Sequence, residues 1–246
     1  MTTISFDEQA AARYDATSAH MFDASVLDPA VDFLANLTAD GAALEFAVGT
    51  GRVALPLSAR GVHVSGIDIS PWMADKLLEK PGADRIGVTV GDYTTTRVDG
   101  TFRLVYLVWN SITNVTTQEG QTTAFRNAAA HLEPGGCFVV EVGVPDLHRL
   151  PPGSTVLPFT VTPTYVGIDE FTDFVGQISY SHHLRIDGDT GYTHSAPYRY
   201  VWPSELDLMA QLAGMRLRKR WSTWTREPFT GDSTSHVSVW EMPESV

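Results

Sequence analysis

The feature that most limits the fold of this chain is an alternation of short apolar runs with helical stretches between Ala42 and Pro145. The helical stretches cover residues 53–60, 71–79 and 118–132. The apolar runs are ALEFAV, VHVSGI, IGVTVG, FRLVYLVW and CFVVEVGV. Such runs, which do not alternate strictly between apolar and polar residues, are typical of strands in a parallel sheet that is buried on both faces. Their alternation with helices predicts an α/β fold.

The flanking regions extend this pattern and interrupt it once. Residues 26–37 have a helical period, and residues 203–213 predict a helix followed by two strands, MRLRKRWSTW and HVSVWEM. The segment 150–201 has no helical period and carries prolines, β-forming residues and aromatic residues. Within it, GQISYSHHLRI and YTHSAPYRYVW flank DGDTG, which predicts two antiparallel strands around a turn. We therefore expect a core domain from residues 1–149 and 202–246, with an inserted antiparallel β segment between its two parts.

The composition of the chain limits the kinds of binding partner and the cellular location that we expect. Seventeen basic residues stand against twenty-nine acidic ones, which gives a formal net charge of −12. Because such a surface repels phosphate backbones, we expect a small-molecule partner and no nucleic acid. No stretch approaches the ~18 apolar residues of a membrane span, and the N-terminus lacks the features of a signal peptide, so we expect a cytoplasmic protein without a membrane partner. The single cysteine, Cys137, and the lack of a metal-ligand spacing predict neither a disulfide nor a metal site.

A glycine turn lies between the first apolar run and the next helical stretch. Gly49 and Gly51 allow the backbone to approach a ligand closely, because they have no Cβ. Asp68 ends the following apolar run, where a carboxylate can accept two hydrogen bonds from a ribose diol. Ligands of open α/β sheets bind at the carboxyl ends of the strands, so the turn and Asp68 are expected to face one crevice. The combination predicts a ligand that contains a nucleoside.

The residues alone leave more than one interpretation of this nucleoside site. The stretch GTGRVA, which begins at Gly49, satisfies the loose dinucleotide fingerprint of a nicotinamide-dependent oxidoreductase. A non-catalytic nucleoside-binding protein is a further interpretation. A different cofactor is favoured by Glu45, which can meet an amine or order the loop, and by Asp92, which can accept a hydrogen bond from an adenine amino group. The helix and two strands at the end of the chain also depart from simple βαβ repeats.

On these residues the sequence resembles the class I S-adenosylmethionine-dependent methyltransferases, especially small-molecule enzymes of actinobacterial type such as the sugar N-methyltransferases. The resemblance covers roughly residues 10–145 and 203–242 and resides in EFAVGTGR, GIDIS, GDY and LEPGG. It implies S-adenosyl-L-methionine as the cofactor and methyl transfer to an N or O atom of a small metabolite. It also implies a Rossmann-like, mostly parallel seven-stranded sheet of order 3-2-1-4-5-7-6, with helices on both faces and the seventh strand antiparallel.

The resemblance assigns roles around the methionine end of the cofactor. The residues of the glycine turn and its strand that would line this end are Glu45, Ala47, Gly49 and Gly51. Tyr14 would reach the cofactor carboxylate with help from Arg52, and Val108 would lie where the methyl group projects. The chain departs from the family at Ala47, where the first glycine of the turn is usual.

The adenosine end is assigned in the same way. Asp68 would hold the ribose. Ile69 and Met73 would flank the adenine, and Asp92 with Tyr93 would meet its edge.

Candidate residues for contact with the acceptor or for its activation follow the fourth and fifth strands and lie in the insertion. Trp109 would either contact the sulfonium through cation–π attraction or pack against the sheet. Asn110 would either donate a hydrogen bond to the substrate or cap the next turn. The candidate general bases are His148, His182 and His183. Because adjacent residues on a strand point to opposite faces, at most one of the two neighbouring histidines can face the pocket.

The aromatic insertion at 150–201 has two interpretations. As a cap over the strand ends, it would bury the acceptor and keep water away from the sulfonium. As an exposed antiparallel hairpin, it would offer edges through which two copies pair into a homodimer. The cap is the favoured interpretation, and one segment can serve both roles.

Overall fold

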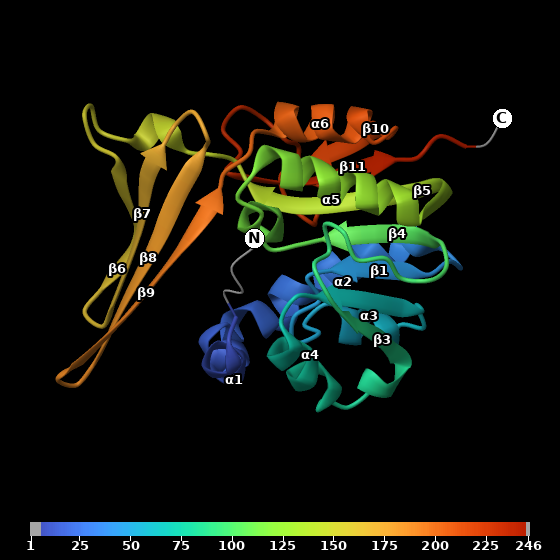
Figure 1. Ribbon diagram of the computed structural model, residues 1–246, viewed down its shortest axis with the longest axis horizontal. Helices are drawn as coiled ribbons and strands as arrows, with labels where there is room; N and C mark the ends of the chain where they lie inside the picture. The colour runs from blue at the N-terminus through green and yellow to red at the C-terminus, as the bar shows by residue number, and fades with distance from the viewer. Residues whose placement is uncertain (1–5, 245–246) are drawn as a thin grey trace.

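The computed structural model describes residues 6–244 and is built around a seven-stranded sheet (Figure 1). The first five strands are β1 (Ala43–Phe46), β2 (Val64–Asp68), β3 (Ile86–Val90), β4 (Phe102–Leu107) and β5 (Leu132–Gly143). The last two are β10 (Arg216–Trp221) and β11 (Ser235–Glu241). The strand order is β3-β2-β1-β4-β5-β11-β10, and only β11 runs antiparallel to its neighbours within the described residues. Counted along this sheet, the order is 3-2-1-4-5-7-6, which confirms the predicted fold.

Helices cover both faces of the main sheet. On one face, α5 (Gln118–His131) and α6 (Pro203–Leu212) pack Phe125 and Leu206 into a cluster with Leu44 of β1. On the other, α2 (Ala24–Thr38), α3 (Ala54–Ala59) and α4 (Pro71–Leu78) pack Leu34, Leu57 and Leu77 into a second cluster with Ala43. Successive residues of β1 thus belong to opposite clusters. Because both faces of the strand are buried, both must be apolar, which explains the uninterrupted run in the sequence.

Shorter helices join these elements. The N-terminal helix α1 (Glu8–Thr17) is followed by one turn of 3₁₀ helix, η1 (Ala19–Phe22). Three further 3₁₀ turns are η2 (Ala83–Arg85), η3 (Ser111–Asn114) and η4 (Leu147–Arg149). None of the helices between residues 6 and 244 is both long and apolar enough to cross a lipid bilayer.

The insertion forms a second sheet, which we call the cap sheet. Its strands are β6 (Val156–Thr162), β7 (Tyr165–Asp173), β8 (Ile178–Asp187) and β9 (Thr190–Arg199). They pair antiparallel in this order, so the two predicted strands are β8 and β9, and the cap sheet is twice as wide as the predicted hairpin. Figure 1 shows the cap sheet on the side where β5 ends. Since β1, β2 and β4 run parallel to β5, this is the side of their carboxyl ends.

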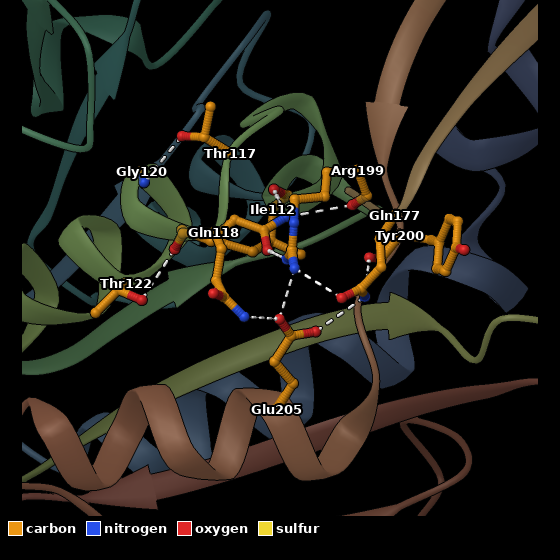
Figure 2. A network of polar contacts seen from close by, with 10 residues as sticks. Ile112, Thr117, Gln118, Gly120, Thr122, Gln177, Arg199, Tyr200 and Glu205 are labelled. Carbon is orange, nitrogen blue, oxygen red and sulfur yellow. Dashed lines mark hydrogen bonds and ion pairs between the residues drawn. The ribbon is translucent and has the colours of Figure 1, made fainter. Parts of the chain in front are cut away.

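A buried polar network joins the cap sheet to the core (Figure 2). Arg199, at the end of β9, pairs with Glu205 of α6 at 2.6 Å and donates to the Gln177 side chain at 2.8 Å. The same guanidinium donates to Gln121 of α5, and Gln118 donates to Glu205 at 2.6 Å. The Arg199 side chain is only 3% exposed. Its charge is therefore compensated by groups from three separate elements, which fix the base of the cap sheet against α5 and α6.

Candidate functional site

The glycine turn has a left-handed backbone conformation at three positions. Ala47, Gly49 and Gly51 all have positive φ, at 53°, 55° and 80°. A Cβ on Gly51 would lie 2.8 Å from the Cγ atom of Leu77, so glycine is required there for packing as well as for conformation. Ala47 adopts the left-handed region despite its methyl group, at a cost of about 1 kcal/mol. The helix that follows begins only at Ala54, three residues after the second glycine.

Asp68 closes the turn from the neighbouring strand. Its Oδ2 accepts a hydrogen bond from the Gly49 N–H at 2.8 Å, and its Oδ1 accepts one from the Ser70 N–H at 2.8 Å. Burial raises the pKa of Asp68, and the two backbone N–H groups offset part of this shift. Gly49 and Asp68 line the same cavity, so the prediction that the turn and the carboxylate share one crevice is confirmed.

This cavity, with a volume of about 670 Å³, lies between the carboxyl ends of the strands and the cap sheet. Five of the residues predicted to contact the cofactor line this cavity: Tyr14, Ala47, Gly49, Asp68 and Met73. Burial raises the pKa of the Tyr14 hydroxyl, and the Arg52 guanidinium opposes this shift. The guanidinium also stands 5.5 Å from the centre of the Trp109 ring. The turn, α1 and the loop after β4 therefore meet around one end of the cavity.

A second set of contacts holds α1 against the turn. Thr50 donates to the Asp15 carboxylate at 2.6 Å, and Lys80 pairs with the same carboxylate at 2.5 Å. Lys80 also donates to the Thr50 carbonyl at 2.8 Å. Since Asp15 follows Tyr14 directly, this arrangement fixes the helix that carries Tyr14 to the backbone of the turn.

Glu45 lies in β1 beneath the turn and is only 2% exposed. It accepts a hydrogen bond from the Tyr106 hydroxyl at 2.9 Å. Burial raises the pKa of Glu45 to about 8, and hydrogen bonds from Tyr106 and the Ala54 backbone oppose this shift. These contacts tie β1 to β4 and to the start of α3. Of the two roles weighed for Glu45, the geometry favours ordering of the loop.

The side chains of two of the predicted cofactor residues pack in the core. The Tyr93 ring stacks on Phe46 in the core, and its hydroxyl donates to the Ser111 carbonyl at 2.9 Å, so the ring does not meet a ligand in the cavity. The Val108 side chain is 7% exposed and belongs to the other core cluster. Both residues lie close to strand ends, where a sequence pattern does not show whether a side chain points into the core or into the cleft.

Five other predicted cofactor residues also lie outside the cavity lining: Glu45, Gly51, Arg52, Ile69 and Asp92. Asp92 accepts hydrogen bonds from the Thr94 N–H at 2.8 Å and from the Thr94 hydroxyl at 2.7 Å. This carboxylate therefore orders the loop that follows β3.

Trp109 and Asn110 both line the cavity and both have positive φ, at 55° and 57°. The Trp109 N–H donates to the Glu141 carboxylate at 3.0 Å, and the Asn110 N–H donates to the Glu141 backbone carbonyl at 3.2 Å. The Asn110 side chain accepts a hydrogen bond from the Gly143 N–H at 2.7 Å and makes no capping bond to η3. Asn110 thus stands at the N-cap position of η3, but its side chain does not form the capping bond. Asn110 instead connects the loop after β4 to the end of β5.

The three candidate histidines have different environments. The His148 side chain is 84% exposed beside Asp146, and His182 lies between Glu170 and Ser195 on the other face of the cap sheet. Neither His148 nor His182 lines the cavity. His183 does line the cavity, so one of the two neighbouring histidines faces it, as the alternation along a strand requires. Its Nδ1 lies 2.6 Å from the Tyr165 hydroxyl, and burial lowers its pKa.

The sequence analysis did not identify most of the cap residues that line the cavity. They occupy alternate positions on one face of the cap sheet, which we call the pocket face: Leu157, Asp169, Phe171, Ser179, Ser181, His183 and Tyr198. The alternation of Ser179, Ser181 and His183 in the predicted strand was a usable signal. Asp169 and Phe171 lie in β7, which the sequence pattern did not resolve as a strand.

Comparisons with known proteins identify the family. Residues 43–136 match the family model for the methyltransferase domain. A solved relative with 33% identity covers 88% of this chain and 89% of its own, with a TM-score of 0.79. The chain therefore belongs to the S-adenosylmethionine-dependent methyltransferases. It is an enzyme whose cofactor is S-adenosylmethionine, and the nicotinamide-dependent and non-catalytic interpretations are set aside.

The relative with 33% identity is the methyltransferase CcbJ from Streptomyces caelestis. Two solved structures share the fold at lower identity. The amino pentose methyltransferase CalS10 from Micromonospora echinaspora has 20% identity over 91% of this chain and 95% of its own, with a TM-score of 0.68. The sugar N-methyltransferase KedS8 from a Streptoalloteichus species has 18% identity over 94% and 93%, with a TM-score of 0.67. Comparison of the sequence with curated proteins gives no match.

The residues of the cavity fit this cofactor. Each carboxylate oxygen of Asp68 accepts one backbone hydrogen bond and keeps a further lone pair, so the group can also accept from a ribose diol. Gly49 has no side chain on the cavity side of the turn, and Met73 provides an apolar surface beside it. Tyr14 of α1 lines the same cavity. Asp68, Gly49, Met73 and Tyr14 are the residues that would hold the cofactor.

Proposed function

We propose that this enzyme methylates an N or O atom of a small metabolite that binds in the capped cavity. The observation that carries the proposal is a single cavity that joins Gly49 and Asp68 of the core to Ser181 and His183 of the cap sheet. Its volume of about 670 Å³ falls in the range of ~300–1,000 Å³ common for small-molecule sites. Relatives of similar fold that are named for amino pentose and sugar substrates support an acceptor of this size.

The proposal divides the chain into two functional parts. Residues 1–149 and 202–246 form the core that holds the cofactor, and residues 150–201 form the cap that shapes the acceptor site. The pocket face places Phe171 and Tyr198 over the strand ends, where they exclude water from the reacting groups. The net charge of −12 supports a small molecule over a nucleic acid as the acceptor.

In this arrangement the protein promotes methyl transfer mainly by positioning the acceptor beside the cofactor. Bound S-adenosylmethionine supplies a methyl group on a sulfonium leaving group. The cavity walls hold the acceptor atom in line with that methyl group, and such positioning can lower a barrier by ~7–11 kcal/mol. Proton removal by a general base adds a factor of only ~10²–10⁴. Among the described residues, His183 is the histidine that lines the cavity. Burial lowers its pKa, which favours the neutral imidazole, the form that can accept a proton.

A methylation screen tests this function. The full-length protein is incubated with S-adenosylmethionine and a panel of small amines and hydroxyl compounds, and products are examined by mass spectrometry. We expect a panel compound to gain one methyl group while S-adenosylhomocysteine forms in equal amount. The same screen includes total RNA, DNA fragments and a protein mixture. Methylation of one of these, with none of any small compound, would overturn the proposal.

The dimer interpretation of the insertion has its own test. The face of the cap sheet opposite the cavity exposes Leu184 by 40% and Ile186 by 48%. Light scattering of the wild type and of a Leu184→Lys variant measures whether this face joins two copies. A wild-type dimer that becomes a monomer in the variant would show that the cap sheet also serves as an interface.

A further inference from the structure

The charges that line the cavity are of one sign. Its lining includes the carboxylates Asp68, Asp146 and Asp169, and within residues 6–244 it includes no lysine or arginine. Its one histidine, His183, has a pKa lowered by burial. The cavity as a whole therefore disfavours an anionic acceptor and favours one that carries positive charge.

Two of the three carboxylates already have partners within the protein. Asp68 accepts two backbone hydrogen bonds. Asp146 lies 3.1 Å from the His148 ring and 3.2 Å from the Arg149 guanidinium. Asp68 is therefore engaged by the glycine turn and faces the cofactor end. The Asp146 charge is offset by His148 and Arg149, although its buried Oδ1 accepts no hydrogen bond in the described part of the chain.

Asp169 differs from both. It lies on the pocket face of β7 opposite Ser181, two residues before Phe171, and no ion pair joins it to any other residue in the described part of the chain. Burial raises its pKa, a hydrogen bond from the Ser181 hydroxyl opposes this shift, and His182 acts on it only at longer range. The next residue, Glu170, points to the other face and bonds to His182 at 3.1 Å.

Asp169 shares the cavity with Tyr198 and Tyr14. Burial raises the pKa of Tyr198, and the charges of Asp169 and Tyr14 raise it further. Tyr198 therefore lies within electrostatic reach of both groups, and all three line the cavity. A molecule held by Asp169 would lie in the cavity that Tyr198, Phe171 and Tyr14 also line.

From this geometry we propose that Asp169 binds a protonated amine of the acceptor and makes the enzyme selective for cationic acceptors. This inference rests on the proposed function and adds the substrate class to it. A half-buried carboxylate without a counter-ion, such as Asp169, is stabilised when a ligand brings one, because the ammonium replaces lost solvation by a charge-assisted hydrogen bond. An acceptor with a carboxylate in that position would leave two like charges facing each other.

The proposal is tested with three probes of one shape and different charge: benzylamine, benzyl alcohol and benzoate. Each is titrated into the full-length protein loaded with S-adenosylhomocysteine, and binding is measured by calorimetry or ligand-observed NMR. We expect benzylamine to bind at least tenfold more tightly than benzoate. An Asp169→Asn variant should lose about tenfold in affinity for benzylamine, as expected for one lost charge-assisted hydrogen bond. Its affinity for benzyl alcohol should change less than twofold.

Glu170→Gln is the matched control, because it removes a carboxylate one residue away on the opposite face of the same strand. It should leave all three affinities unchanged. Titration of S-adenosylhomocysteine shows that each variant is folded. Equal binding of benzoate and benzylamine, or an Asp169→Asn variant that binds benzylamine as well as the wild type, would overturn the inference. The proposed function fails separately, if the methylation screen yields no methylated small molecule even though benzylamine binds through Asp169.

Discussion

The two sheets of this enzyme are stabilised in different ways. The main sheet has helices on both faces, and residues such as Leu44, Phe138 and Val139 are completely buried in it. The cap sheet directs one face toward the cavity and leaves the other open, where Val161 is 70% exposed and Ile186 is 48% exposed. The core that holds the cofactor is therefore stabilised by apolar burial on two sides.

The cap sheet depends instead on its base. Its principal polar attachment to α5 and α6 is the network around the Arg199 guanidinium, which is 3% exposed (Figure 2). Burial of apolar surface is not directional, whereas a network of charged hydrogen bonds fixes an orientation. The comparison indicates that the fold of the core and the placement of the acceptor site depend on different residues, so the two can be changed separately.

The largest expected effect comes from phenylalanine truncation in the two regions. Phe138 is fully buried and packs against the rings of Phe46, Phe125 and Trp240, so Phe138→Ala should lower the free energy of unfolding by about 3–5 kcal/mol. Phe159 on the cap sheet is 46% exposed, and Phe159→Ala should cost less than about 1 kcal/mol. Urea unfolding followed by circular dichroism measures both values. Equal losses would remove the distinction between the two sheets.

The next effect concerns the base of the cap sheet. Arg199→Met should lower the free energy of unfolding by about 3 kcal/mol, because Glu205 would be left largely buried without its counter-ion. Arg216→Ala is the control, since Arg216 is 71% exposed in its pair with Glu241 and such pairs contribute only ~0–1 kcal/mol. Chemical denaturation of both variants gives the comparison. An Arg199→Met variant no less stable than Arg216→Ala would show that the network does not hold the cap sheet.

A smaller effect separates cofactor binding from the cap. Asp68→Ala should weaken binding of S-adenosylhomocysteine by ~1–3 kcal/mol, because a charged hydrogen-bond acceptor is lost. Asp68→Asn, which keeps one carbonyl oxygen for the Gly49 N–H, controls for disturbance of the turn. Ser181→Ala on the pocket face should leave this affinity unchanged. Calorimetric titration measures all three, and unaltered binding by both Asp68 variants would contradict the ribose role.

The same contrast explains which parts of the fold could be predicted from the sequence. Strands of the main sheet are apolar on both faces, so β1, β4 and β5 appear as continuous runs that few other structures produce. Strand β6 is mostly exposed, contains Pro158, and shifts register between Pro158 and Thr160. These features remove the regular alternation by which a half-buried strand is recognised, which explains why the sequence pattern does not predict β6.

The residues of the candidate site likewise fall into a group that the sequence could place and a group that it could not. Gly49 and Asp68 could be placed because each follows directly from the end of a parallel strand, and parallel strands bring their ends together. The direction in which His148, Asp169 or Tyr93 points depends instead on tertiary packing. His148 lies on an exposed turn, Asp169 faces the cavity from the cap sheet, and Tyr93 packs on Phe46. No local pattern carries this information.

The smallest expected effect is on the pH dependence of stability. Burial would raise the pKa of Glu205, but hydrogen bonds from Arg199, Gln118 and Gln177 outweigh it, so the pKa is lowered from its usual value of 4.5. A folded-state pKa below the unfolded value contributes stability that is fully present above about pH 4.5 and is lost as the pH falls through the folded pKa. Glu205→Gln should therefore lose part of the acid dependence of unfolding that the wild type shows below that pH. Glu119→Gln, which removes an exposed carboxylate from α5, should keep the wild-type dependence. Urea unfolding from pH 3 to 7 measures the three curves, and identical slopes for Glu205→Gln and the wild type would mean that the ionised network contributes nothing to holding the cap sheet in place.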